Sequence, residues 1–522
     1  MRIVWAVGLR VLLLACLSAC TSNEIIRSKI EKSNPTVCDF KGQPDLARFT
    51  KQGRDGCTRY SIEDHQEYTL AFVEFDDQGW LYDRAQMDLL MKELEKQTED
   101  GSDLSIFVYV HGWKHNAEFC DDNVCCFRET LQQMNVLEGK YADTYKWHKR
   151  KVFGIYVGWR GLSLRGPDFI RSTSFYSRKN AATRVALGST RELLGKIKDF
   201  YERKNAPRDK VAARKSTQQL PMQTLEDRQE RRAGTRLLTM GHSFGGLVVY
   251  TAVAQALMES AIEPEKFDQQ QLVKPFGDLV FIVNPAFEGT RYEPLHQIAK
   301  HRRYPRYQPP VFVAVTSQAD DATGKAFPIG RWINGVWEKY STGKEGETIA
   351  HTAAEQRDAN VNTIGHAERY RTHRLDYTPS KRMDAKIEQK AADTGNCGCP
   401  YHSGIENLLA GANIPTEYND WKTNLKNDGD WKIDMKYKSE ANTGHRRKGW
   451  TRKYTDDSTL THDPKDPDSS PDNPFWVVYT GKDVIPDHNG FYTPLFLNFV
   501  RHVYDDSLHL WNLQNKLNPR PQ

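Results

Sequence analysis

The residues best placed to do chemistry are centred on Ser243, in the stretch Gly241-His242-Ser243-Phe244-Gly245. The largely apolar residues 236–240 predict a buried strand before it, and the apolar residues 247–250 predict a helix after it. A glycine two residues to each side of the serine removes side chains that would collide in a tight strand-to-helix turn. Such a turn lifts a serine hydroxyl above the edge of a sheet, where a base can reach it. The pattern therefore predicts Ser243 as the nucleophile of an acyl-transfer reaction.

The elements that must position this serine are read from apolar runs and their periods. Short, nearly continuous apolar runs predict buried strands, and weaker helical periods recur between these runs. Strands that alternate with helices indicate an α/β protein with a mostly parallel sheet and helices on both faces. The predicted strands are 68–75, 104–110, 151–157, 236–240, 279–283, 311–315 and 475–479, and the predicted helices are 82–97, 126–137, 180–201, 244–250 onward and 491–511.

Four segments with reactive or glycine-rich character come after predicted strands, in the segments that leave their carboxyl ends. They are His111-Gly112-Trp113, Ser243, Asp320-Asp321 and Asp487-His488. In open parallel sheets, ligands sit at the carboxyl ends of the strands. We therefore expect all four segments to meet at one edge of the sheet.

This arrangement resembles the α/β-hydrolase family over about residues 68–511, apart from insertions at 204–235 and 322–474. The resemblance rests on the glycine-flanked Ser243, on the His111-Gly112 pair after an earlier strand, and on the chain order serine, acid, histidine. It implies an α/β-hydrolase fold with a long insertion before the last strand. It also implies a lipase-like or esterase-like activity.

A serine hydroxyl is a weak nucleophile at neutral pH and needs a base oriented by a carboxylate. The resemblance places the base at His488, which follows the last predicted strand and precedes the last predicted helix. His242 is expected to point away from its neighbour Ser243 and to support the packing, and His111 is expected to be structural. Three histidines lie in the insertion with no predicted strand before them: His351, His366 and His373.

The acid is expected a few residues after the strand 311–315, where Asp320 and Asp321 stand side by side. We favour Asp320 and expect Asp321 to face solvent or the start of the insertion. A second position after the preceding strand is occupied by Asn284, with Glu288 nearby. Asp487 is expected to solvate its own loop, because adjacent residues rarely orient one another's rings.

The transition state of acyl transfer places negative charge on the former carbonyl oxygen, which backbone N–H groups can stabilise. The resemblance assigns these donors to the backbone of Phe244, directly after the nucleophile, and of Trp113, in the loop after the His-Gly strand. No phosphate-binding loop of the P-loop type occurs, and His111 and His115 lack the glutamate of a zinc-protease motif. We therefore expect no cofactor and no catalytic metal.

The first 20 residues read as a targeting segment. Arg2 is followed by a mostly apolar stretch that ends in Leu17-Ser18-Ala19-Cys20. This stretch is short for a membrane span and resembles a bacterial signal peptide. The last four residues resemble the lipobox of bacterial lipoproteins, in which the cysteine carries the lipid; the alternative is an ordinary signal peptide cut nearby. With Thr21 and Ser22 after the cysteine, the resemblance favours the outer membrane.

Charge and cysteines are consistent with an exported enzyme. The net charge of +5 is small for 522 residues and its signs are interspersed, so nothing favours nucleic acid as a partner. Seven cysteines remain beyond Cys20, an odd number, so at least one is free or paired between chains. Cys38 and Cys57 are a plausible clip of the N-terminal arm. Cys397 and Cys399 fit a disulfide or structural role better than a metal site.

The sequence thus predicts an exported, lipid-anchored serine hydrolase that cleaves carboxylic esters, with Ser243, His488 and Asp320 as its triad, and it leaves open whether the substrate is a lipid. Phe327, Trp332, Trp337 and Tyr340 either line a substrate cleft or simply pack the insertion. Alternatives are a thioesterase, amidase or acyltransferase on the same fold, or an anchored binding protein without catalysis. The expected divisions are a signal peptide at 1–19, a tether and irregular arm at 20–66, a core at 67–321 with a charged insertion at 204–235, a capping insertion at 322–474, and the last strand and helix at 475–522.

Overall fold

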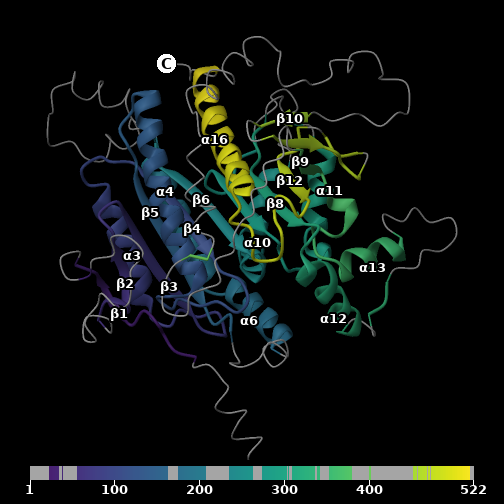
Figure 1. Ribbon diagram of the computed structural model, residues 1–522, viewed down its shortest axis with the longest axis horizontal. Helices are drawn as coiled ribbons and strands as arrows, with labels where there is room; N and C mark the ends of the chain where they lie inside the picture. Colours follow the sequence, from purple (N-terminus) through teal and green to yellow (C-terminus); the bar gives the residue numbers. More distant parts are fainter. Residues whose placement is uncertain are drawn as a thin grey trace, which may run out of the picture.

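The computed structural model describes residues 23–34, 38, 56–162, 174–206, 234–262, 273–302, 304, 308–334, 338–340, 352–378, 399–400, 451–454, 457–466, 468–470 and 472–517. Within these residues the chain forms one mixed, mostly parallel sheet of twelve strands and nine α-helices. The predicted α/β class is therefore confirmed. Figure 1 shows the sheet running through the molecule with helices packed against it.

The centre of the sheet consists of parallel strands whose order is β3-β5-β4-β6-β7-β8-β12. The chain steps from β4 outward to β5 and then returns to place β6 on the other side of β4. The neighbouring strands β4 and β6 therefore form the switch point of the sheet, where parallel sheets commonly bind ligands. The strands are β3 (Tyr68–Phe75), β4 (Leu104–Val110), β5 (Lys151–Trp159), β6 (Arg236–His242), β7 (Leu279–Val283), β8 (Phe312–Ser317) and β12 (Phe475–Thr480).

The N-terminal arm, expected to be irregular, instead adds two strands to one edge of the sheet. β2 (Tyr60–Asp64) pairs antiparallel with β3, and β1 (Lys29–Lys32) pairs parallel with β2. Both strands are short and rich in charged residues, so their apolar pattern is weak in the sequence. Their stability comes from pairing with the sheet edge, which the local sequence does not reveal.

The insertion 322–474 also contributes more than a cap, because it extends the opposite edge of the sheet. β9 (His373–Tyr377) pairs parallel with β12, and β11 (Ser458–His462) and β10 (Thr451–Lys453) continue from it in antiparallel register. β9 begins at His373 itself and was not predicted from the sequence. β9 and β11 alternate buried and partly exposed residues over only five positions each, too few for a firm prediction.

Helices cover both faces of the sheet and enclose two apolar cores. One core packs against α4 and α16 and the other against the remaining long helices (Figure 1). The helices are α3 (Arg84–Gln97), α4 (Asp122–Tyr145), α6 (Phe175–Leu187), α7 (Thr190–Asn205), α10 (Phe244–Ala261), α11 (Glu293–His301), α12 (Phe327–Asn334), α13 (Ala353–Val361) and α16 (Pro494–Leu517).

The helix predicted over 180–201 is two helices, α6 and α7, that meet at Gly188 and Ser189. The break follows from a close approach, because a Cβ at Gly188 would lie 2.3 Å from the carbonyl oxygen of Gly79. The Ser189 amide donates to that same oxygen at 2.9 Å. The contact joins the helix pair to the turn after β3, so a long-range approach decides where α6 ends.

Disulfides clip the N-terminal arm and join the insertion to α4. Cys38 pairs with Cys57, as predicted, and Cys126 on α4 pairs with Cys399 of the insertion. Cys120 is disulfide-bonded as well, whereas Cys125 is a buried free thiol. Within the described part of the chain, no helix combines the length and apolar character that a bilayer crossing requires.

Candidate active site

Ser243 sits on a strained turn between β6 and α10. Its backbone has a φ of 57°, in the region that L-residues seldom adopt. The glycines around it are required by space, since a Cβ at Gly245 would lie 1.9 Å from the Val110 oxygen. A Cβ at Gly241 would lie 2.5 Å from the oxygen of Gly245. The collisions expected from the glycine spacing are therefore real, and the turn forms only with glycine at these two positions.

The structure brings Ser243, His488 and Asp320 into one hydrogen-bonded line. His488 Nε2 lies 2.8 Å from Ser243 Oγ, and His488 Nδ1 lies 2.9 Å from Asp320 Oδ1. The three residues come from the ends of β6, β8 and β12, which are far apart in the sequence. Their spacing suits proton transfer from the serine to the imidazole, with the carboxylate holding the imidazole ring in place.

Asp320 is fully buried and is held ionised by its partners. Its Oδ1 accepts the amides of Ala322 and Thr323 at 3.0 and 3.1 Å, and its Oδ2 accepts the Thr323 hydroxyl. Burial alone would raise its pKa, but His488 and the Thr323 donors outweigh burial and lower it to about 2. Asp320 is therefore a carboxylate at neutral pH, as an orienting acid must be.

The other acidic residues near the site have different partners. Asp321 is exposed and pairs with Lys325 at 2.7 Å, so it faces solvent as expected. Asp487 accepts the amides of Asn489 and Gly490, both at 2.8 Å, which shapes its own loop. Glu288 is buried and pairs with Lys179 and Arg291, away from the histidine. Among the described carboxylates, Asp320 is the one bonded to His488.

The loop that carries His488 is fastened by two side chains from neighbouring strand ends. His242 Nε2 lies 2.8 Å from the His488 carbonyl oxygen, and the two imidazole rings lie 4.9 Å apart. Asn284 donates to the same oxygen at 2.9 Å and accepts the Ser317 amide at 3.0 Å. Asn284 thus ties the loop to the end of β8. The sequence offered one signal for this role, a polar residue directly after a buried strand.

The remaining histidines near the site are structural in this arrangement. His111 is fully buried, accepts the Trp159 amide at 3.0 Å and stacks on the Trp159 ring. Burial lowers its pKa to about 4, so it is neutral at physiological pH. His366 packs beside Gly324 and bonds Thr363 at 3.1 Å, and burial lowers its pKa to about 4 as well. His351 lies outside the described residues.

The backbone donors expected for an oxyanion lie beside the serine. Phe244 opens α10, where the first amides of a helix have no intrahelical acceptor. Gly112, next to Trp113, passes so close that a Cβ there would lie 2.8 Å from the Cβ of Ser243. Neither the Phe244 nor the Trp113 amide has an acceptor among the described residues. Both amides are therefore free to bind a developing negative charge.

The four aromatic residues singled out in the insertion have different surroundings. Phe327 is buried and its ring lies 6.3 Å from that of Phe175, which in turn lies 4.9 Å from Phe244. Trp332 is 65% exposed, so it does not line an enclosed cleft. Tyr340 accepts a hydrogen bond from Asn360, and Trp337 lies outside the described residues.

Comparisons with known proteins leave the site to be interpreted from its own geometry. No family model, no curated protein and no solved structure matches this chain. Over the described ranges, no three histidine, cysteine or acidic side chains are grouped so as to hold a metal ion.

Proposed function

We propose that this protein is a serine hydrolase with an α/β-hydrolase fold and that it cleaves carboxylic esters. The observation that carries the proposal is the line from Ser243 through His488 to Asp320, with heavy-atom distances of 2.8 and 2.9 Å. The chain order of these residues, the strained turn at the serine and the parallel sheet around it support the same proposal. A binding protein would have no evident use for a strained serine bonded to a buried histidine–carboxylate pair.

The reaction follows from the protons and charges that this geometry handles. His488 Nε2 takes the proton of Ser243 Oγ as the oxygen attacks the ester carbonyl. The amides of Phe244 and Trp113 bind the resulting oxyanion, each worth about 3 kcal/mol in comparable sites. His488 then gives the proton to the leaving alcohol, and the acyl group remains on Ser243. Water, activated by the same histidine, releases the acid and restores the serine.

We further propose that the protein is exported and anchored by lipid at Cys20, in the outer membrane of a bacterium. Cys20 lies outside the described residues, so the proposal rests on the lipobox-like sequence. Replacement of the cysteine, Cys20→Ser, should release the protein from membranes and abolish metabolic labelling with fatty acid. Membrane retention of the unlabelled variant would contradict the lipid anchor.

The test of the enzymatic proposal is hydrolysis of a panel of esters of graded acyl-chain length, with thioesters and amides of the same acyl groups beside them. The chain should hydrolyse esters faster than amides, and Ser243→Ala should abolish turnover while circular dichroism shows an unchanged fold. Preference for a thioester or an amide would move the assignment to another acyl-transfer class. No turnover of any member, with the serine intact, would favour a binding role.

A further inference from the structure

Four large apolar side chains are exposed along one edge of the molecule. We call them the apolar rim: Trp80, Leu187, Ile329 and Trp332, which are 72%, 51%, 63% and 65% exposed. The two other large apolar side chains of comparable exposure among the described residues, Val136 and Ile262, lie elsewhere, on α4 and at the end of α10. Exposed tryptophan and aliphatic side chains that share one edge are costly in water and indicate a contact surface.

Two members of the apolar rim lie near the turn that follows the carboxyl end of β3. Trp80 is in the turn that follows this strand, where its amide donates to Asp76 at 2.9 Å. Leu187 ends α6 and is next to the Gly188–Ser189 break, which bonds the same turn through Gly79. Trp80 and Leu187 are thus fixed to neighbouring backbone segments at the catalytic edge of the sheet.

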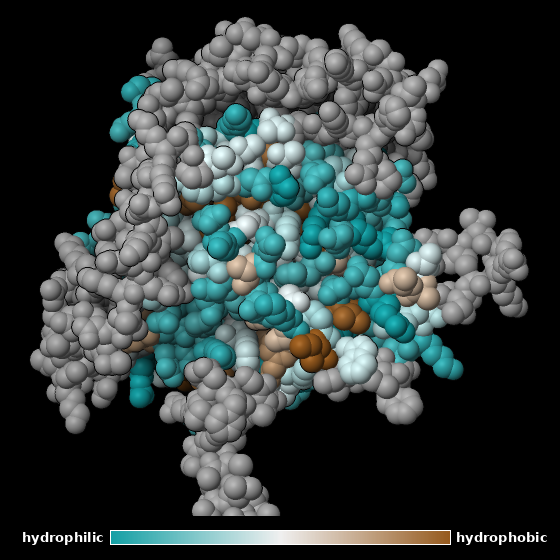
Figure 2. Space-filling view, turned by 45° about the vertical axis from the view of Figure 1, so that its right-hand side comes forward, coloured by the Kyte–Doolittle hydropathy of each residue, from teal (hydrophilic) through white to brown (hydrophobic). Residues whose placement is uncertain are grey.

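The other two members lie on α12, which packs beside the start of α6. Tyr176 donates to the Phe327 oxygen at 3.5 Å, and Phe327 packs against Phe175. Phe175 also contacts Phe244, the residue after the nucleophile, so α12 borders the active site. Figure 1 shows α6 and α12 together at the lower edge, and Figure 2 shows brown, apolar residues at that edge.

The N-terminal arm reaches the same edge. Asn23 accepts a hydrogen bond from Tyr82, two residues beyond Trp80. The amides of Ile26 and Arg27 donate to Glu74, near the carboxyl end of β3, at 3.0 and 2.8 Å. In Figure 1 the purple arm runs past β1 to the lower edge. The arm therefore enters the fold beside Trp80.

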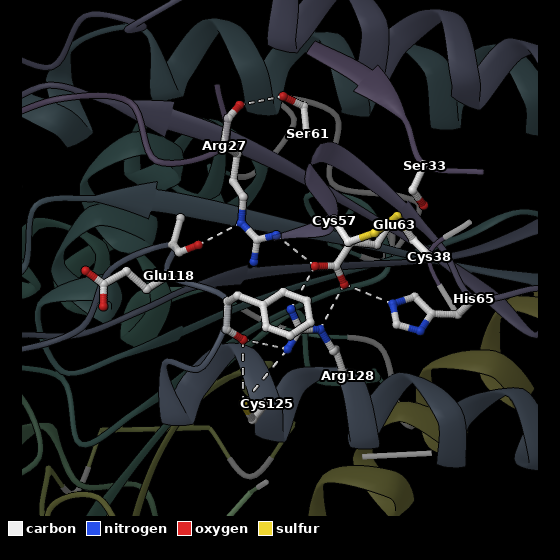
Figure 3. Close-up of polar contacts among 12 residues, drawn as sticks. Arg27, Ser33, Cys38, Cys57, Ser61, Glu63, His65, Glu118, Cys125 and Arg128 are labelled. Carbon is white, nitrogen blue, oxygen red and sulfur yellow. Dashed lines mark hydrogen bonds and ion pairs between the residues drawn. A yellow bond between two sulfur atoms is a disulfide. The ribbon is translucent and has the colours of Figure 1, made fainter. Parts of the chain in front are cut away.

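A buried ion network fixes this arm to the core. Arg27 is fully buried and donates to Glu63 at 2.8 Å (Figure 3). It also donates to the Ala117 oxygen at 2.8 Å, and its guanidinium covers the Phe72 ring. Arg128 from α4 donates to both carboxylate oxygens of Glu63, at 2.7 and 2.8 Å. Breaking such a network would leave buried charges unpaired, so the arm is a rigid part of the fold.

The length of chain before the arm limits where a lipid at Cys20 can lie. Cys20 and Asn23 are three residues apart, and three extended residues span about 10 Å. The lipidated residue is thus confined to the neighbourhood of Tyr82 and Trp80. A surface that must lie next to the membrane is then also the surface with exposed tryptophan, leucine and isoleucine.

We propose that the apolar rim rests in the lipid surface and that the active site takes esters carried by that surface. This inference depends on the proposed hydrolase function for its substrate and on the lipid at Cys20 for its geometry. Tryptophan rings favour the membrane–water interface, and aliphatic side chains gain from burial below it. The two contacts, lipid and rim, fix the orientation of the protein, with the Ser243 edge towards the bilayer.

The direct test uses the full-length lipidated chain in phosphatidylcholine vesicles that contain acyl-chain-brominated lipid, which quenches tryptophan fluorescence on contact. The double variant Trp80→Phe with Trp332→Phe should lower the quenched part of the emission by about half or more, because these rings lie at the interface. The control Trp476→Phe removes a buried tryptophan of β12 and should leave the quenched part unchanged. Equal quenching of the double variant and the unaltered chain would overturn the proposal.

A second measurement tests the substrate class. The variant Leu187→Ser with Ile329→Ser should lower the ratio of vesicle-borne to water-soluble ester turnover by about 10-fold, since polar side chains weaken insertion. The matched control, Val136→Ser with Ile262→Ser, alters equally exposed residues on other faces and should keep the ratio. An unchanged ratio in the rim variant would contradict delivery from the lipid surface.

The two proposals fail in distinguishable ways. If neither ester is hydrolysed, the hydrolase function is wrong, while the quenching result still decides whether the apolar rim contacts lipid. The Ser243→Ala chain should be quenched like the unaltered chain although it hydrolyses nothing. If the unaltered chain hydrolyses the soluble ester normally but its tryptophans are not quenched, only the proposal that the apolar rim contacts lipid is rejected.

Discussion

The backbone of Ser243 is strained, and this strained conformation places its hydroxyl next to the imidazole of His488. The φ of 57° places the side chain above the sheet, within 2.8 Å of His488. A strained residue costs of the order of 1–3 kcal/mol and persists where the surroundings over-determine it. Here the close-packed glycines and the bond from the Ser243 amide to Val283 hold the turn. The strained residue is thus the one that carries the hydroxyl needed for the proposed reaction.

The adjacent aspartates provide a matched pair of variants at the residue scale. Asp320→Asn should lower kcat by roughly 10²–10⁴-fold with little change in KM, because the imidazole loses the anion that orients it and stabilises its charged form. Asp321→Asn removes an exposed charge one residue away and should leave kcat nearly unchanged. Steady-state kinetics on one soluble ester compares them. A larger loss in Asp321→Asn would assign the acid to the neighbouring position.

Sequence reasoning predicted Ser243 and Asp320 because each one follows a strand within a few residues, and it predicted His488 from its place between the last strand and the last helix. It did not predict Asn284 as the residue that ties the His488 loop to β8. Asn284 and His488 are 204 residues apart, and their contact depends on the side-by-side packing of β7, β8 and β12. A local pattern carries no information about such a pairing, so the support of the site appears only in three dimensions.

At the scale of elements, long apolar strands could be predicted and short polar ones could not. β4 and β7 are buried along their whole length, which their sequences show directly. β1, β9 and β11 contain charged or hydroxyl side chains and gain their stability from pairing at the sheet edges. The division of 180–201 into α6 and α7 likewise depends on a contact with Gly79, about a hundred residues earlier. The short edge strands and the break between α6 and α7 could not be predicted because tertiary contacts determine them.

Two glycines, Gly245 in the β6–α10 turn and Gly195 in α7, test how tightly these elements are packed. Gly245→Ala should prevent the β6–α10 turn from forming, because the added Cβ would lie 1.9 Å from the Val110 oxygen. We expect loss of soluble protein or of several kcal/mol of stability, as for other overpacked buried sites. The control Gly195→Ala lies within α7, where an added Cβ meets nothing within 4 Å. It should stabilise the protein by about 1 kcal/mol through helix propensity.

Urea unfolding followed by circular dichroism compares the two glycine variants. A Gly245→Ala protein as stable as the unaltered chain would show that the turn is looser than its geometry indicates. Destabilisation by Gly195→Ala would point to a contact of α7 that its open surroundings do not show.

At the scale of the whole molecule, buried histidines make stability depend on pH. Burial is the largest cause that lowers their pKa below the ordinary value of 6.5, to about 4 for three of them and further for the others. These histidines lie on or near strands from β4 to β11 and on α16, so their protonation affects the whole fold. They are His111, His242, His366, His373, His462 and His502.

The free energy of unfolding should therefore fall as the pH falls from about 6.5 towards 4. In this window the unfolded chain binds protons that the folded chain excludes, so acid favours the unfolded state. Asp320 adds to the effect only at the acid end of this window, because its folded pKa of about 2 lies below the ordinary value of 3.8 that it regains on unfolding. Urea midpoints at pH 7.5 and pH 5 test this, with a lower midpoint expected at pH 5. An equal or higher midpoint at pH 5 would contradict the burial of these histidines in neutral form.

The measurement that bears most directly on the central proposal is covalent labelling by a fluorophosphonate, which reacts with a serine only where a neighbouring base activates it. Peptide mapping should find the label on Ser243, and His488→Ala should slow labelling by about 10³-fold or more while circular dichroism stays unchanged. Absence of label from Ser243 in the folded protein, or labelling that does not depend on His488, would contradict the assignment of this site as a serine hydrolase.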